Sequence, residues 1–137
     1  MLDKFLKAQA SSYASAKAEL EVGKKTSHWM WFIFPQIKGL GSSETAHYYA
    51  LADLKEAELY LRHPVLGKRL IDLAEILLRI PSNKATEIFG TPDDMKLRSS
   101  MTLFSQVKNA DPVFDKVLDK FFNGEKDNRT INILKKT

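Results

Sequence analysis

Apolar positions recur along this chain at the spacing of a helix, and residues typical of helix ends separate the segments. The clearest apolar stripe steps by four, three and four residues: Leu66, Leu70, Leu73 and Leu77. The opening segment, Asp3 to Glu21, has a similar apolar face and is followed by Gly23, a residue favoured just after a helix. Both patterns predict amphipathic helices.

Helix-start signals divide the rest of the chain. Ser42 and Ser43, followed by Glu44, predict a helix that runs to about Leu61. Short groups of capping residues and prolines mark the later starts: His63-Pro64, Ser82-Asn83, Thr91-Pro92-Asp93-Asp94, Asp111-Pro112 and Asp127. In the third of these groups the hydroxyl of Thr91 is the expected N-cap.

The apolar run from His28 to Phe34 is ambiguous. Its length and aromatic content are typical of a buried strand, whereas Ser27 is a suitable helix cap, so periodicity leaves both open. No internal repeat or linker divides the chain. The sequence therefore predicts a single all-α domain over residues 1–137, with six or seven helices and one short buried strand as an option at residues 28–34.

Composition narrows the class of protein without naming a function. A chain of 137 residues is one ordinary domain, and the lack of cysteine excludes disulfides and thiolate metal sites and favours a cytoplasmic location. The longest apolar run, Trp29 to Pro35, is too short to span a bilayer, so no membrane association is expected. Histidine spacings match no metal site. The oligomeric state stays open.

The charge pattern permits an anionic partner without demanding one. The net charge is +4. Between Lys116 and Lys136 the lysines alternate with acidic residues, which is typical of a solvated surface and argues against a nucleic-acid-binding stripe.

Candidate chemistry begins in residues 27–36. Trp29 and Trp31 offer ring surfaces, His28 titrates near neutral pH, and Gln36 carries both a donor and an acceptor. These residues suit a ligand with a ring and a polar edge. The competing interpretation is a core element in which His28 binds a backbone carbonyl.

The segment that follows, residues 37–44, resembles an anion cradle. Gly39 and Gly41 allow close approach of the backbone, Lys38 adds a positive charge, and Ser42 precedes the free N–H groups of a predicted helix. No phosphate-binding P-loop and no dinucleotide fingerprint is present, so no cofactor is expected. The competing interpretation is an ordinary turn with a helix cap.

A third candidate region spans residues 89–104. Asp94 and Arg98 lie four residues apart beside an apolar stripe, with Thr102 one turn further on, and Lys96 lies between them. Arg98 suits a phosphate or carboxylate. The competing interpretation is a surface ion pair between Asp94 and Arg98, worth a few tenths of a kcal/mol.

Three blocks of this sequence carry a resemblance to a known family. They are SHWMWFIFPQ (27–36) with GLG (39–41), HPVLG (63–67) with RL (69–70), and FG (89–90) with PDDMKLRSSMTLF (92–104). The chain resembles a bacterial family of about this length that is catalogued as a domain of unknown function, eighteen-ten in that series. The resemblance covers nearly the whole chain and implies a mainly helical single domain with no established activity.

Two other names are associated with this pattern. Some members of the family carry the label calpastatin, which does not fit, because inhibitors of that name are long, disordered and repetitive. A weaker similarity, to the ADP-ribose-processing family related to riboflavin biosynthesis, rests on Ser43-Glu44 and His47-Tyr48. These two pairs lie two residues further apart than that family's helix start requires.

Two hypotheses follow. In the first, the 27–44 and 89–104 segments form a pocket for a small anionic or nucleotide-like ligand, with hydrolysis of an N-glycosidic bond as a candidate reaction. Its acid or base would be Glu44, Asp94 or His28, and its binding residues Trp29, Trp31, Gln36, Lys38, Ser42, Lys96 and Arg98. In the second, the protein is a non-catalytic helical module that binds a protein or nucleic acid. The sequence leaves open whether the protein is an enzyme.

Overall fold

The computed structural model describes residues 2–136 and confirms an all-α fold. Nine helices lie within these residues: α1 (Asp3–Val22), α2 (Met30–Ile33), α3 (Glu44–Tyr49), α4 (Leu54–Arg62), α5 (Leu66–Arg79), α6 (Ala85–Phe89), α7 (Asp93–Ser105), α8 (Val113–Phe122) and α9 (Asn128–Lys135). Six of them have seven or more residues, in keeping with the predicted number. The described residues form no strand, and one isolated parallel bridge joins Ile37 to Leu51.

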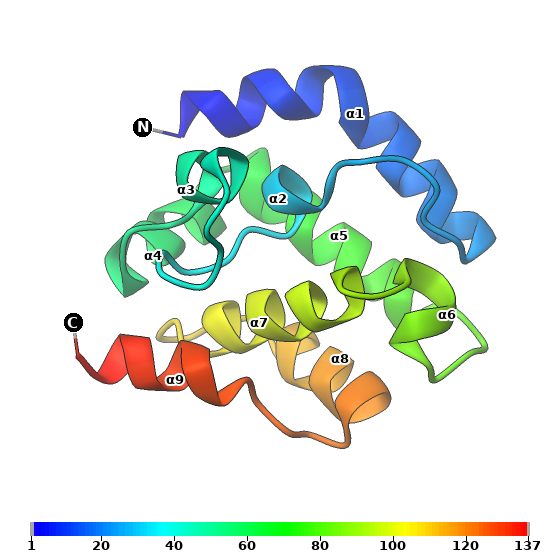
Figure 1. Cartoon of the computed structure of the whole chain (residues 1–137). Coiled ribbons are helices and arrows are strands. Elements are labelled where there is room, and N and C mark those ends of the chain that lie inside the picture. The colour runs from blue at the N-terminus through cyan, green and yellow to red at the C-terminus, as the bar shows by residue number, and fades with distance from the viewer. Residues whose placement is uncertain (1, 137) are drawn as a thin grey trace.

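Helix α5 lies at the centre, with α1 across one side of it and α7 and α8 on the other (Figure 1). Helix α9 packs on α7, and α2 packs on α1 and α3. The predicted stripe of α5 is fully used, since each of its leucines is buried: Leu66, Leu70, Leu73 and Leu77. Each such side chain stabilises the fold by roughly 1.5–3 kcal/mol.

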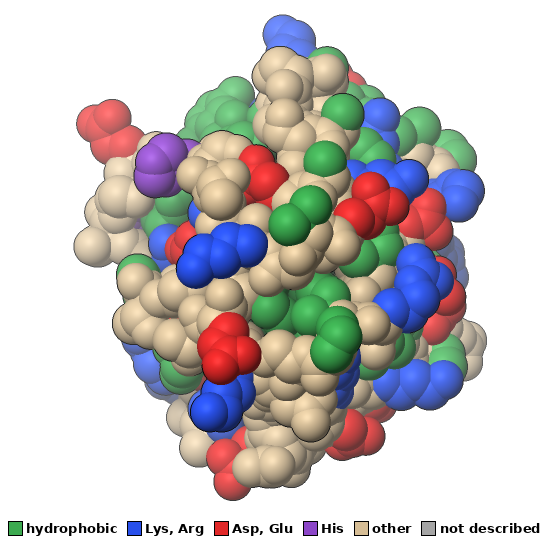
Figure 2. Space-filling view, turned by 90° about the vertical axis from the view of Figure 1, so that its right-hand side faces the viewer, with side chains coloured by type: hydrophobic (Ala, Val, Ile, Leu, Met, Phe, Trp, Pro, Cys, Tyr) green, Lys and Arg blue, Asp and Glu red, His purple; other side chains and the backbone are tan. Residues whose placement is uncertain are grey.

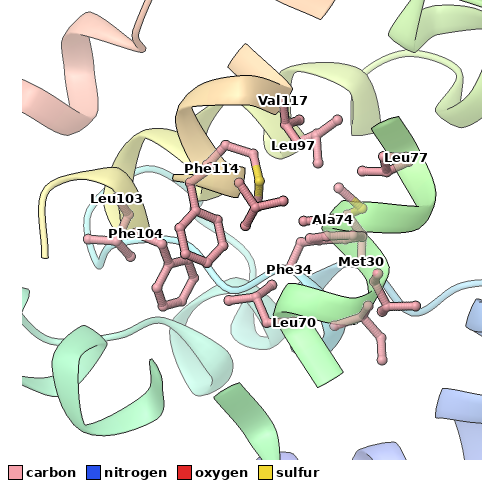
Figure 3. Packing of buried hydrophobic residues seen from close by; sticks show 14 of the residues in the cluster. Met30, Phe34, Leu70, Ala74, Leu77, Leu97, Leu103, Phe104, Phe114 and Val117 are labelled. Atoms are coloured by element: carbon pink, nitrogen blue, oxygen red, sulfur yellow. The ribbon is translucent and has the colours of Figure 1, made fainter. Parts of the chain in front are cut away.

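The core joins α5 to α7 and α8 through aromatic side chains. Figure 3 shows Phe34, just after α2, among residues of α5, and Phe104 of α7 against Phe114 of α8. The rings of Phe104 and Phe114 have centroids 5.7 Å apart. All three phenylalanines have no exposed surface. The segment after α2 is therefore anchored in the centre of the molecule.

The option of a strand at residues 28–34 is wrong, because the segment forms one helical turn, α2. The burial pattern gives the reason. Trp29, Met30, Ile33 and Phe34 are buried while Trp31 and Phe32 are partly exposed, which is a helical spacing and not the alternation of a strand. Pro35 follows and ends the turn.

The single helix expected from Ser42 to Leu61 is also wrong, because the chain breaks into α3 and α4. Between them Leu51 is extended and fully buried, and its N–H donates to the carbonyl of Gln36 at 2.9 Å. Asp53 then caps α4 by accepting the N–H of Glu56 at 2.8 Å. This break brings the 36–41 segment against α3.

Most predicted helix ends are confirmed. Gly23 closes α1 in the left-handed conformation, His63 accepts the N–H groups of Val65 and Leu66 before α5, and Asp127 caps α9. The expected capping role of Thr91 is wrong. Pro92 occupies the N-cap position of α7 without a side-chain bond, and the carboxylate of Asp94 accepts the nearby N–H of Met95 at 2.9 Å.

The caps expected ahead of α6 are also absent. Lys84 occupies the N-cap position and makes no side-chain cap bond, while the hydroxyl of Ser82 accepts the N–H of Lys84 at 3.1 Å just before the helix.

Candidate functional site

Two hollows open side by side between the α2–α3 segment and the start of α7. The first, about 290 Å³, is lined by His28 and Thr45 on one wall and by Asp93 on the other; we call it the α1-side hollow. The second, about 320 Å³, is lined by residues from three segments and is called the α9-side hollow: Gln36, Leu40, Met95, Ser99 and Arg129 among them. Trp31 and Lys96 line both, so the hollows meet at this pair and form one cleft.

The contact between Lys96 and Trp31 divides the cleft. The Lys96 ammonium lies 4.1 Å from the centroid of the Trp31 ring, a cation–π distance worth about 0.5–1 kcal/mol at a partly exposed site. The same ammonium donates to Asp93 at 3.1 Å, and the Lys96 side chain is 22% exposed. A cation is thus held over an aromatic ring at the mouth of the cleft.

Gly41 is required by its close packing against Ala46 and the Trp31 ring. A Cβ atom at Gly41 would lie 2.5 Å from the Cβ of Ala46 and 3.2 Å from the Trp31 ring. Only glycine leaves room for such close packing.

Gln36 lies on the wall of the α9-side hollow with an unpaired amide nitrogen. Its side chain is 7% exposed, and within residues 2–136 its Nε2 has no hydrogen-bond partner. A buried donor without a partner costs about 1–3 kcal/mol. The nitrogen is closed off from solvent, so a ligand that accepts its hydrogen bond would remove this cost after the Gln36 side chain turns toward the hollow.

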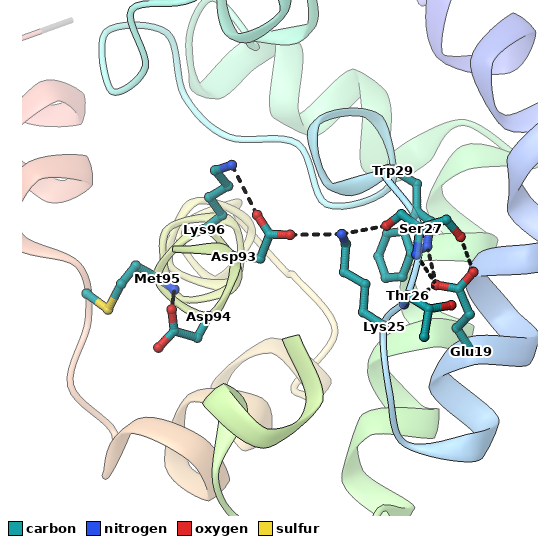
Figure 4. Close-up of polar contacts among 9 residues, drawn as sticks. All are labelled: Glu19, Lys25, Thr26, Ser27, Trp29, Asp93, Asp94, Met95 and Lys96. Atoms are coloured by element: carbon teal, nitrogen blue, oxygen red, sulfur yellow. Dashed lines mark hydrogen bonds and ion pairs between the residues drawn. The ribbon is translucent and has the colours of Figure 1, made fainter. Parts of the chain in front are cut away.

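Glu19 of α1 anchors the loop that leads into the cleft (Figure 4). Its carboxylate accepts the N–H of Thr26 at 2.7 Å, the N–H of Ser27 at 3.0 Å and the indole N–H of Trp29 at 2.9 Å, and the Ser27 hydroxyl donates to it as well. Burial acts to raise the pKa of Glu19, but the hydrogen bonds from Ser27, Thr26 and Trp29 outweigh it and lower the pKa to about 2.

Lys25 connects this loop to α7. Its side chain is 7% exposed, and its ammonium donates to the Ser27 carbonyl at 2.6 Å and pairs with Asp93 at 2.8 Å. Burial acts to raise the pKa of Asp93, but hydrogen bonds from Lys25 and Lys96 outweigh it and hold the pKa below its ordinary value. Figure 4 shows the resulting row of Lys96, Asp93, Lys25 and Ser27. Asp93 is therefore a fixed anion that orients Lys96.

Of the residues predicted to form the site, His28, Trp31, Gln36 and Lys96 line the cleft. His28 is exposed in the α1-side hollow. Trp29 also lines this hollow, but its side chain is 1% exposed and its indole N–H is used by Glu19, so it belongs mainly to the core.

The predicted ion pair between Asp94 and Arg98 is not formed. Arg98 donates to the carbonyl oxygens of Glu125 and Lys126 at 2.9 and 3.0 Å, and Asp94 accepts the hydroxyl of Thr86 at 3.1 Å. The loop before α9 lies against α7, so these two carbonyls and the carboxylate of Glu125, 3.6 Å away, engage the guanidinium in place of Asp94. Arg98 thus ties down the loop before α9, and neither Asp94 nor Arg98 lines either hollow.

The structure places Lys38, Ser42 and Glu44 outside the cleft. All three are exposed and line neither hollow. Ser43 caps α3 by accepting the N–H of Ala46 at 3.1 Å, which uses one of the donors that an anion cradle would need.

Helix α9 contributes residues that sequence reasoning missed. Asp127 and Arg129 line the α9-side hollow. The hydroxyl of Ser99 donates to Asp127 at 3.2 Å, and the N–H of Asp127 donates to the hydroxyl of Thr102 at 2.9 Å. Asp127 was predicted only as a helix cap, and no local pattern shows that it also docks α9 on α7.

Figure 2 shows the face at the α6 end of the molecule. No large patch of side chains of one charge sign lies on this face. Lys and Arg side chains there are interspersed with Asp and Glu. Among the described residues no helix is both long and apolar enough to cross a bilayer, and no group of three or more His, Asp and Glu side chains is arranged to hold a metal ion.

Comparison with known proteins gives two matches. Residues 1–134 match the family model described as "Protein of unknown function (DUF1810)". The conserved hypothetical protein Rv1873 from Mycobacterium tuberculosis, a crystal structure at 1.38 Å, is 45% identical; the match covers 99% of this chain and 97% of that one, with a TM-score of 0.97. No curated protein matches this chain.

Proposed function

Because the chain belongs to the DUF1810 family, whose description assigns no activity, we propose a function from the cleft itself: the protein binds a small anionic ligand there. The observation that carries the proposal is the unpaired amide of Gln36 on the cleft wall. Buried polar groups are normally paired, and those left unpaired in a concave site are candidates for a ligand contact.

The charges around the cleft support an anion. Lys25, Lys96 and Arg129 line it against two carboxylates, Asp93 and Asp127. Asp93 is neutralised by the two lysines, and Asp127 accepts the N–H and hydroxyl of Thr130 as the cap of α9. Arg129 is exposed and forms no ion pair within residues 2–136. It is free to meet an anion in the α9-side hollow.

The same geometry favours binding over hydrolysis. Glu44 and Asp94 lie outside the cleft, and the two carboxylates that line it are already engaged by fixed donors. A general acid or base has to reach the reacting bond with a proton to give or take. Of the predicted acid–base residues, His28 alone lines the cleft, so the proposal is one of binding.

Thermal unfolding with a ligand panel tests the proposal. The panel comprises inorganic phosphate, ribose 5-phosphate, mononucleotides, ADP-ribose and citrate. A ligand at about a hundred times its Kd stabilises by about 2.7 kcal/mol, which raises the Tm of a domain of this size by roughly 5–10 °C. At least one anion is expected to give such a rise.

The variant Gln36→Leu separates binding from folding. It removes the unpaired amide at similar volume, so the free protein is expected to be at least as stable as the wild type while the ligand-induced rise is lost. Lys116→Gln, at an exposed position on α8 outside the cleft, is the matched control and keeps the full rise. If no anion raises the Tm, or if Gln36→Leu responds like the wild type, the proposal is wrong.

A further inference from the structure

Resting on the proposed function, we propose that the ligand carries a planar aromatic ring next to its anionic group, as a nucleoside monophosphate does. The ring stacks on Trp31, and Lys96 leaves that ring to pair with the anion. Lys96 thus occupies, in the free protein, the place that the ring takes on binding.

Trp31 is available for stacking in a way that the neighbouring rings are not. Trp29 packs against Phe34 and Phe89, with centroids 6.2 and 6.4 Å away, and Phe32 packs against Tyr49 at 5.2 Å. Within residues 2–136 no aromatic ring packs against Trp31; the Lys96 ammonium lies over its ring, and Gly41 packs beside it. Its ring surface faces both hollows.

The α9-side hollow has the lining that a ring requires. Leu40, Pro92 and Met95 give it apolar walls, and the Met95 side chain stays 46% exposed although it is large and apolar. Gln36 adds an amide on the same wall. An amide carries a donor and an acceptor together, which matches the edge of a nucleobase.

Lys96 is able to make the exchange without backbone movement. Its four-carbon side chain lines both hollows, and its ammonium is tethered to Asp93 and lies over a ring that offers no full charge. A phosphate offers that full charge and several acceptor oxygens. Stacked bases contribute more than a partly solvated cation over the same ring, so a ligand with both groups displaces Lys96 from Trp31.

Calorimetric titration of ligand fragments tests the inference. The probes are the four ribonucleoside monophosphates, their nucleosides and ribose 5-phosphate. We expect the best monophosphate to bind at least about tenfold more tightly than either its nucleoside or ribose 5-phosphate, because only it reaches both Trp31 and Lys96. Binding is also expected to change the emission of Trp31, a signal that Trp31→Phe removes.

Two variants separate the two halves of the ligand. Lys96→Met keeps the apolar stem and is expected to weaken the monophosphate about tenfold while the nucleoside binds as well as before or better, because the competing cation is gone. Trp31→Ala is expected to weaken the monophosphate and the nucleoside but not ribose 5-phosphate. Lys116→Met serves as the matched control. If Trp31→Ala does not fold, Lys96→Met still decides the matter.

The possible failures are distinguishable. If ribose 5-phosphate or inorganic phosphate binds as tightly as any monophosphate, and Trp31→Ala leaves that binding intact, the ring is refuted and the anion-binding function stands. If Lys96→Met weakens nucleoside and monophosphate equally, the exchange of Lys96 is refuted. If none of the anions binds, the proposed function and this inference fail together.

Discussion

Replacing Glu19 by glutamine tests how the loop before α2 is held. The carboxylate accepts hydrogen bonds from Thr26, Ser27 and Trp29, and its pKa is lowered from 4.5 to about 2. That difference corresponds to at most about 3 kcal/mol of stability at neutral pH. Because the side chain is partly exposed, solvent screening reduces the expected effect to about 1–2 kcal/mol.

The pH dependence gives the sign. A carboxyl whose pKa is lowered in the folded protein stabilises the fold above its unfolded pKa, and the contribution is lost as the pH falls through the folded value. For Glu19 that window runs from 4.5 down to about 2. Wild type and Glu19→Gln are therefore expected to differ by about 1–2 kcal/mol at pH 7 and to converge towards pH 2.5.

Urea unfolding at several pH values between 2.5 and 7 measures this difference. Glu21→Gln, an exposed change on the same helix, is the control and is expected to stay within about 0.5 kcal/mol of the wild type throughout. A deficit in Glu19→Gln that is the same at pH 2.5 and pH 7 would show that the charge of Glu19 is not what holds the loop.

Three further changes are expected to have measurable effects. Gln9→Leu removes a buried amide that hydrogen-bonds to the carbonyl of Phe32, the hydroxyl of Tyr60 and the guanidinium of an α5 arginine. It is expected to lower the free energy of unfolding in urea by about 2–3 kcal/mol, and a loss below about 0.5 kcal/mol would show that these hydrogen bonds do not stabilise the fold. Gly41→Ala forces a Cβ against Ala46 and is expected to cost about 1–3 kcal/mol, so an unchanged Tm would count against the packing described for Trp31. With any anion that raises the Tm, Lys96→Gln is expected to reduce the rise and Lys38→Gln to leave it unchanged, whereas the reverse result would restore the predicted cradle at residues 37–44.

The helical architecture follows from local patterns, and the breaks in it do not. The α5 stripe and the caps at His63 and Asp127 depend on neighbours within a few residues, so spacing and residue type are sufficient to predict them. The division between α3 and α4 depends on Leu51, which pairs with Gln36 fifteen residues earlier. A local signal does exist, since Asp53 and Glu56 have the spacing of a capping box.

The candidate site shows the same contrast between features set by nearby residues and features set by residues far along the chain. Trp31, with its ring surface, and Gln36, with a donor and an acceptor, were predicted as ligand residues in or beside an apolar run, and both line the cleft. Arg98 was predicted on the same grounds, but its guanidinium binds carbonyls of the loop before α9, 27 and 28 residues further along the chain. No spacing within one helix shows whether an arginine will meet a ligand or a distant loop.

The position of Lys96 connects the stability of the fold to the properties of the cleft. Glu19 fixes the loop that carries Lys25, Lys25 holds Asp93, and Asp93 holds Lys96 over Trp31. Lys25, Asp93 and Lys96 thus form a row of alternating charge at the mouth of the cleft, and Lys25 is joined to Glu19 through Ser27, whose carbonyl accepts from Lys25 and whose N–H and hydroxyl donate to Glu19. Because Lys25 is almost fully buried, loss of Asp93 would leave its charge unpaired away from water, so Asp93 stays in place when Lys96 turns from the ring to an anion. This arrangement lets one long side chain move while everything behind it remains fixed, which is what a site needs if its cation is to exchange a ring for a ligand.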